Sequence, residues 1–186
     1  MIRPRFVVLT LMVFGAAAMR LLPHPPNFTP MIPLALFGGA YYSSRRAAFL
    51  VPLMAMAISD LGLTLMNGYA FVSPMRLIIY GLFAFMTLWG LLMKNRVTWK
   101  GAIGSTLGGS VLFFVVTNFA VWFRGDGIVY PMNVDGLVAC YIAAIPFFRN
   151  MLAGSLLYAG VLFGGFELAR RRFRSLDSLP ETGMAR

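Results

Sequence analysis

The chain has 186 residues, of which 59% are apolar and 12% are charged, and its formal net charge at pH 7 is +10. Soluble domains are about 45–50% apolar and about 25% charged, so this chain has too few polar residues to cover a globule of its size. The composition excludes a soluble domain and a disordered chain, and it predicts an integral membrane protein. A single cysteine and a single histidine exclude a disulfide framework and a zinc cluster built from those ligands.

Apolar stretches follow one another along the chain, without the alternation of a membrane β-barrel. They cover residues 6–22, 30–43, 47–66, 74–93, 102–123 and 137–169. The second is short for a crossing of about 30 Å, and the last is too long for one span. We therefore expect a short helix over 137–148, broken near Pro146 and Arg149-Asn150, and then a full span over 151–169. The sequence predicts an all-α protein with six transmembrane helices.

Lysine and arginine are distributed unevenly between the two sides that these spans define. The side that holds both termini and the connections after the second and fourth spans carries 12 of the 16 basic residues. Because basic connections stay in the cytoplasm, both termini are predicted to be cytoplasmic, which requires an even number of crossings. The lipid bilayer then accounts for the net charge, and nucleic acid is not an expected partner. We expect one transmembrane domain over residues 1–174 and a short polar cytoplasmic tail over 175–186.

Polar residues gather at the non-cytoplasmic ends of the spans, and Asp60 is the most informative of them because it ends an apolar run. A carboxylate at membrane depth needs a partner or marks a site. One interpretation is an ion pair with an arginine that fixes helix register, and the other is a ligand contact in a pocket that opens outward. Arg20, Arg76 and Arg149 are all candidate partners.

A proline-rich connector over residues 23–30 holds His24 and Asn27. Its four prolines fix the backbone, so His24 has a defined position. A histidine in a loop is often only a hydrogen-bonded side chain, but one held between prolines at the mouth of a pocket also suits a ligand contact.

The sequence offers no complete catalytic set. Cys140 is interpreted as a small buried residue, because the single histidine lies far along the chain. Ser105 has no evident acid to orient a base, and no phosphate-binding loop for ATP is present. We therefore expect neither an enzyme nor a metal site, and no bound cofactor.

Residues 20–30, 58–61, 117–122 and 140–150 resemble a bacterial membrane-protein family, which in turn resembles the S components of energy-coupling factor (ECF) vitamin transporters. The BtuM-type cobalamin transporters are the nearest characterised relatives of that kind. The resemblance implies a six-helix bundle in the bacterial inner membrane that takes up a vitamin-like solute, with cobalamin or another corrinoid as the first candidate. It also implies an ECF ATPase and coupling module as a partner. The first span lacks the usual spacing of the small residues that dock such a module, so the protein either works alone or uses a different docking surface.

The resemblance matches His24 and Asp60 to a histidine and an aspartate that surround the corrin. Ser73 or its neighbours stand where those transporters have a cobalt-ligating cysteine, so direct ligation of cobalt is not expected. The ligand-binding residues that we expect are His24, Asn27, Asp60, Tyr69, Ser73, Arg76, Arg149 and Asn150. The alternative is a membrane scaffold or assembly subunit in which the pairs between Asp60 and arginine are structural.

Overall fold

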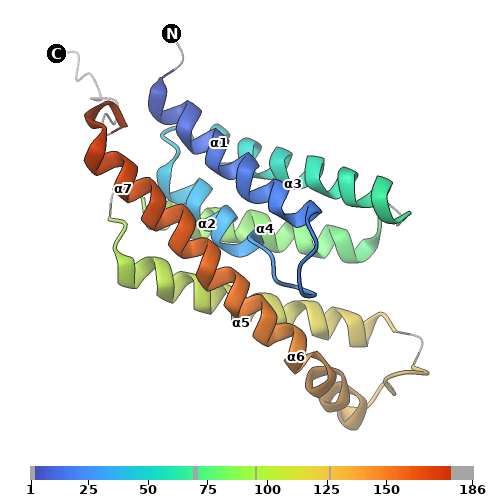
Figure 1. Cartoon of the computed structure of the whole chain (residues 1–186). Coiled ribbons are helices and arrows are strands. Elements are labelled where there is room, and N and C mark those ends of the chain that lie inside the picture. Colours follow the sequence, from blue (N-terminus) through green and yellow to red (C-terminus); the bar gives the residue numbers. More distant parts are fainter. Residues whose placement is uncertain (1–2, 69–70, 95, 126, 177–186) are drawn as a thin grey trace, which may run out of the picture.

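The computed structural model describes residues 3–68, 71–94, 96–125 and 127–176, in which every regular element is helical. Six apolar helices follow one another close to the predicted bounds, which confirms the all-α prediction (Figure 1). They are α1 (Pro4–Ala18), α2 (Met31–Tyr41), α3 (Arg45–Asn67), α4 (Pro74–Leu92), α5 (Trp99–Phe123) and α6 (Val134–Ala159). α6 continues through a π-helical turn (Gly160–Gly164) into α7 (Gly165–Arg172). Most of the tail predicted over 175–186 lies outside the described residues.

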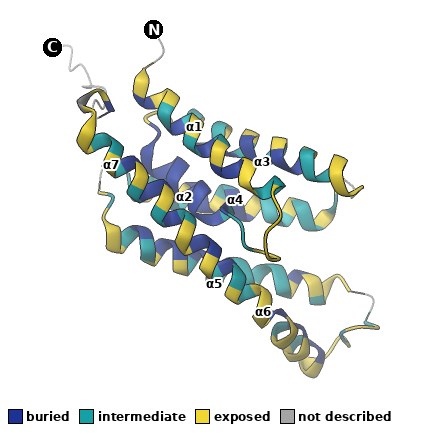
Figure 2. Cartoon of the chain, in the orientation of Figure 1, coloured by how far each residue is buried: buried dark blue, intermediate teal, exposed yellow. Residues whose placement is uncertain are grey.

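Five helical segments are long and apolar enough to cross a membrane, namely α1 with its final 3-10 turn, α3, α4, α5 and the continuous α6–α7 segment. α2 has 11 residues, which span about 16 Å, or about half of the hydrocarbon core. Ten of these residues are buried, and Figure 2 shows α2 enclosed by the other helices. α2 is therefore the centre of the bundle and contacts protein on nearly all sides.

The surrounding helices form two groups. α1, α3 and α4 lie together, and α5 lies against α6, with α2 between the groups (Figure 1). The ribbons of the two groups diverge toward the end of the bundle opposite the termini.

The start of α1 and the end of α7 lie at the same end of the bundle, here called the basic end (Figure 1). Arg5 links three segments there, because its guanidinium donates hydrogen bonds to the carbonyl oxygens of Leu176 (3.0 Å) and Tyr41 (3.2 Å). The α2–α3 and α4–α5 connections meet at this end, where Lys94 donates to the carbonyl oxygen of Ser43 at 2.6 Å. The other three connections lie at the opposite end, here called the loop end. The start of α1 and the end of α7 thus lie at one end of the bundle (Figure 1), and the cytoplasmic orientation of the termini stays a prediction.

The interruption predicted near Pro146 and Arg149-Asn150 is a bend within one helix. The helical segment runs from Val134 to Arg172 over 39 residues, or about 58 Å. Pro146 has no N–H to donate to the preceding turn, and its ring crowds that turn. This accounts for the change of direction in the first part of α6 in Figure 1. The separate helices predicted over 137–148 and 151–169 are parts of this continuous segment.

Candidate functional site

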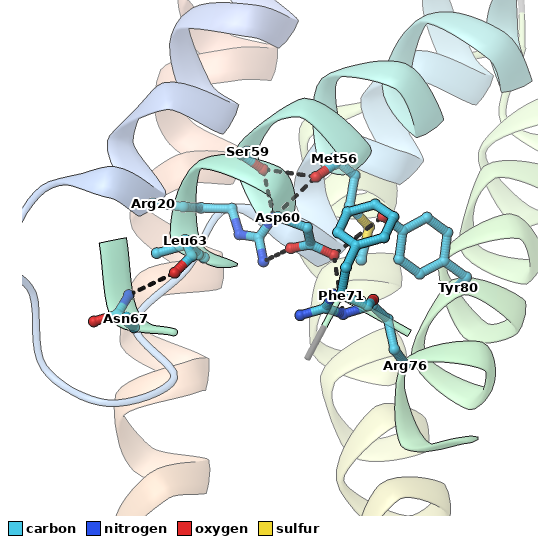
Figure 3. Close-up of polar contacts among 9 residues, drawn as sticks. All are labelled: Arg20, Met56, Ser59, Asp60, Leu63, Asn67, Phe71, Arg76 and Tyr80. Atoms are coloured by element: carbon cyan, nitrogen blue, oxygen red, sulfur yellow. Dashed lines mark hydrogen bonds and ion pairs between the residues drawn. The ribbon is translucent and has the colours of Figure 1, made fainter. Parts of the chain in front are cut away.

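Asp60 lies at the centre of a buried charged cluster in the loop-end half of the bundle (Figure 3). Its side chain is 6% exposed. Oδ1 accepts a hydrogen bond from Nη2 of Arg20 at 2.6 Å. Oδ2 accepts one from the hydroxyl of Tyr80 at 3.1 Å and lies 3.7 Å from Nε of Arg76. We call these four residues together with Ser59 the Asp60 cluster.

Arg20 reaches the cluster from the 3-10 turn that ends α1. Its Nη1 donates to Oγ of Ser59 at 2.5 Å and lies 3.5 Å from the carbonyl oxygen of Met56. Ser59 in turn donates to that same carbonyl at 2.9 Å. The guanidinium therefore joins the end of α1 to one turn of α3 by both charge and hydrogen bonds.

Arg76 reaches the cluster from the first turn of α4. Ser73 begins that helix, and its Oγ accepts a hydrogen bond from the backbone N–H of Arg76 at 3.2 Å. The Arg76 guanidinium also donates to the carbonyl oxygen of Phe71 and lies over the Phe71 ring, 5.3 Å from its centroid. Tyr80 follows one helical turn later and so lies on the same face of α4.

Two guanidinium groups face one carboxylate in this cluster, which leaves it with a formal charge of +1. The Arg20 side chain is only 10% exposed, and its Nε is buried without a hydrogen-bond partner among the described residues. An excess charge at membrane depth is unfavourable unless it is paired. The cluster therefore offers a site where an anionic group would be stabilised.

Two adjoining cavities lie beside the cluster, with volumes of about 230 Å³ and about 190 Å³. Their shared walls include Ile79 from α4, Phe113 from α5, Met151 from α6 and Asn27 from the first connection. We treat them as one loop-end cavity. Arg20 belongs to the wall of the smaller part, so the charged cluster borders an otherwise mainly apolar cavity.

Ser155 on α6 is a second polar residue in the wall of the smaller part. It is 1% exposed, and its Oγ has no hydrogen-bond partner among the described residues. Buried hydroxyls and guanidinium N–H groups are normally hydrogen-bonded. The residues around this cavity thus include two, Arg20 and Ser155, with polar atoms that a bound group could satisfy.

The other residues predicted for the site have different positions. Asn27 lines both parts of the loop-end cavity and has a positive φ of 64°, which asparagine tolerates better than most residues. Asn150 donates from Nδ2 to the carbonyl oxygen of Pro26 at 3.1 Å, so it fastens the proline-rich connection to α6. His24 is exposed, with Nδ1 2.9 Å from the carbonyl oxygen of Pro25. Tyr69 lies outside the described residues.

Arg149 does not join the Asp60 cluster. It is exposed on α6, and no ion pair links it to another residue in the part of the chain that the structure describes. The partners of Asp60 are therefore Arg20 and Arg76, which supports the structural interpretation of the carboxylate. A direct contact between Asp60 and a ligand stays a prediction.

The sequence analysis missed Tyr80, Ser155 and Asn118 as site residues. Tyr80 could have been found, because it lies four residues after Arg76 on one helix face. Ser155 and Asn118 are single polar residues in apolar helices and carry no motif. Asn118 lines the larger part of the loop-end cavity, and its backbone carbonyl accepts a hydrogen bond from Sγ of buried Cys140 at 3.6 Å.

A comparison with family models matches residues 1–176 to a family of unknown function, DUF6580. The chain belongs to this family. The matched region contains every described helix, the Asp60 cluster and the loop-end cavity. A comparison with curated proteins found no match, and neither did a comparison with solved structures. The likeness to S components of ECF transporters therefore stays a prediction.

Proposed function

We propose that this DUF6580 protein is a membrane transport protein that binds a small, vitamin-like solute in the loop-end cavity. The observation that carries the proposal is the position of Arg20, a buried guanidinium in the cavity wall within a cluster of net positive charge. We also propose that the basic end faces the cytoplasm of a bacterial inner membrane, because it gathers most of the basic residues. The loop-end cavity then faces the outside.

The proposed solute has an apolar body and one anionic group, such as a carboxylate or a phosphate. Side chains such as Ile79, Phe113 and Met151 provide apolar walls, and burial of apolar surface is the main favourable term in such sites. The excess charge of the Asp60 cluster favours an anion at one end of the cavity. The solute would therefore bind in one orientation.

The volume of the loop-end cavity can be compared with the size of cobalamin, the first candidate solute. Pockets for drug-sized ligands are about 300–1,000 Å³, and the two parts of the loop-end cavity have about 230 Å³ and about 190 Å³. A small vitamin has a volume of this order. Cobalamin or another corrinoid is larger, so its binding requires the α1–α3–α4 group to move away from α5 and α6.

A visible absorption spectrum distinguishes these cases. The protein is purified from cells grown with cobalamin, and its spectrum is recorded. Corrin bands at near-equal molarity would identify a corrinoid carrier whose two helix groups separate. A colourless protein that binds no added cobalamin would direct the search to smaller anionic vitamins, tested by thermal stabilisation in detergent.

The removal of one hydroxyl from the cavity wall tests the site itself. Ser155→Ala is expected to weaken binding of the stabilising solute by about five- to tenfold, the value of one hydrogen bond. Stability without solute should change little, because the Ser155 hydroxyl has no described partner to lose. Binding is measured by titration calorimetry in detergent.

Ser110→Ala is the matched control. Ser110 is also a buried serine of a membrane helix, but its hydroxyl donates to the carbonyl oxygen of Thr106 on the same helix, at 2.8 Å. Loss of the Ser110 hydroxyl should leave solute binding unchanged. Equal binding by both variants would place the solute elsewhere. A folded protein that binds none of the solutes would favour the alternative of a scaffold in which the Asp60 cluster is purely structural.

A further inference from the structure

A second cavity lies at the basic end, far along the helices from the Asp60 cluster. Its main part has a volume of about 440 Å³ and lies between the end of α2, the start of α5, the π-helical turn and α7. A smaller part of about 160 Å³ adjoins it. The two parts share Tyr41, Val97 and Glu167 in their walls. We call them together the basic-end cavity.

The polar side of this cavity is strongly cationic. Its wall contains one carboxylate, Glu167, and four cationic side chains, those of Arg5, Lys94, Arg170 and Arg171. Glu167 is already neutralised, because Oε1 accepts a hydrogen bond from Arg170 at 2.9 Å and lies 3.7 Å from Nε of Arg171. The cavity therefore attracts anions and disfavours cations.

Lys94 and Arg171 can still bind an anionic group. The Lys94 ammonium has three donors, and one of them is used at the carbonyl oxygen of Ser43. The Arg171 side chain is 77% exposed, and its contact with Glu167 is long. Lys94 belongs to the wall of the smaller part and Arg171 to the wall of the main part, so each offers a cationic group to the basic-end cavity.

The other side of the cavity is apolar and lies beside Trp99. Gly160 and Gly164 of the π-helical turn face the Trp99 ring, and a Cβ placed on either would lie 4.0 Å and 3.9 Å from ring atoms. The missing side chains leave space beside the ring, and π-helical turns are frequent at functional sites. Trp99 and Leu168 are 57% and 70% exposed. In a membrane-spanning bundle such exposed apolar side chains face acyl chains, and tryptophan favours the interface.

We propose that the basic-end cavity binds an anionic phospholipid of the adjacent leaflet. Lys94 and Arg171 bind its phosphate, and the space beside Trp99 and Gly164 holds the first part of an acyl chain. Cationic groups, an interfacial tryptophan and an apolar opening are the features that together recognise a charged lipid rather than a free anion. This inference does not depend on the identity of the solute at the loop end.

Lipid retention in detergent tests the proposal. The protein is mixed with phosphatidylglycerol or phosphatidylcholine, and retained lipid is counted by native mass spectrometry. The original chain should retain phosphatidylglycerol in preference to phosphatidylcholine. Gly164→Leu fills the cavity without a backbone clash and should lower this retention by at least about tenfold. Lys94→Gln and Arg171→Gln should each lower it by about fivefold, with little change for phosphatidylcholine.

Gly104→Leu is the matched control, because Gly104 is an exposed glycine on α5 with no atom within 4 Å of its Cβ position. Retention by this variant should equal that of the original chain. Equal retention by Gly164→Leu, or full displacement of the lipid by inorganic phosphate, would overturn the proposal. If Gly164→Leu fails to fold by circular dichroism, the two charge variants decide the question, since unchanged lipid preference in both would also overturn it.

Discussion

Replacement of Asp60 by alanine is expected to destabilise the bundle by about 3–5 kcal/mol, the cost of leaving a buried charge without its partner. The variant removes the carboxylate that accepts a hydrogen bond from Arg20 at 2.6 Å and lies 3.7 Å from Arg76. Arg20 cannot reach water easily, because its side chain is 10% exposed. Tyr80 would also lose its acceptor. The free energy of unfolding is measured by titration from mild detergent into a denaturing detergent.

Arg76→Gln provides the comparison for this prediction. Arg76 pairs with the same carboxylate, but its side chain is 21% exposed and the pair is longer. Loss of the Arg76–Asp60 pair should lower the free energy of unfolding by only about 1 kcal/mol, as for other partly exposed ion pairs. The double variant Asp60→Ala with Arg20→Met should recover part of the stability, because the more deeply buried guanidinium is then removed together with its carboxylate and only the more exposed Arg76 loses a partner. If Asp60→Ala were as stable as the original chain, the cluster would not hold α1, α3 and α4 together.

The positions of the helices could be predicted because each apolar stretch is long compared with the connections. The start of α4 at Pro74 and the end of α5 at Phe123 agree with the sequence prediction. Pro146 was expected to end a helix, but a membrane helix tolerates an internal proline when its neighbours satisfy the freed groups. The result is a bend, since the rest of α6 keeps its hydrogen bonds.

The partners of Asp60 could not be chosen from the sequence alone. Arg20 is 40 residues from Asp60 in the chain, and only the packing of α1 on α3 brings the two together. Arg149 has the same charge as Arg20 and is also predicted near the non-cytoplasmic end of a span, so the sequence does not distinguish the two as partners of Asp60. The order of the helices in space decides between them, because Arg149 belongs to α6, which packs against α5 in the other group of helices.

The basic-end cavity was missed for a similar reason. Its walls come from three segments that are distant in the chain, represented by Tyr41, Trp99 and Gly164. Gly160 and Gly164 lie four residues apart, a spacing that is typical of closely packed membrane helices. The structure instead places both glycines opposite the Trp99 ring, and a Cβ on either would only just reach ring atoms, so the glycines leave space there.

Replacement of Gly39 or Gly90 by alanine is expected to disrupt the centre of the bundle, with a loss of about 3 kcal/mol or more. These glycines let the backbones of α2 and α4 touch. A Cβ on Gly39 would lie 2.8 Å from Cα of Gly90 and closer still to the carbonyl oxygen of Thr87. Both obstacles are backbone atoms, which cannot move aside without separating the helices.

Gly15→Ala and Gly81→Ala are the controls for this last prediction, because no atom lies within 4 Å of a Cβ at either position. Both should be neutral or slightly stabilising, since alanine favours helices over glycine by about 1 kcal/mol. Equal unfolding free energies for Gly39→Ala and Gly15→Ala would mean that α2 and α4 do not touch. A loss confined to Gly39 and Gly90 would show that the close approach of the α2 and α4 backbones holds α2 to the α1–α3–α4 group.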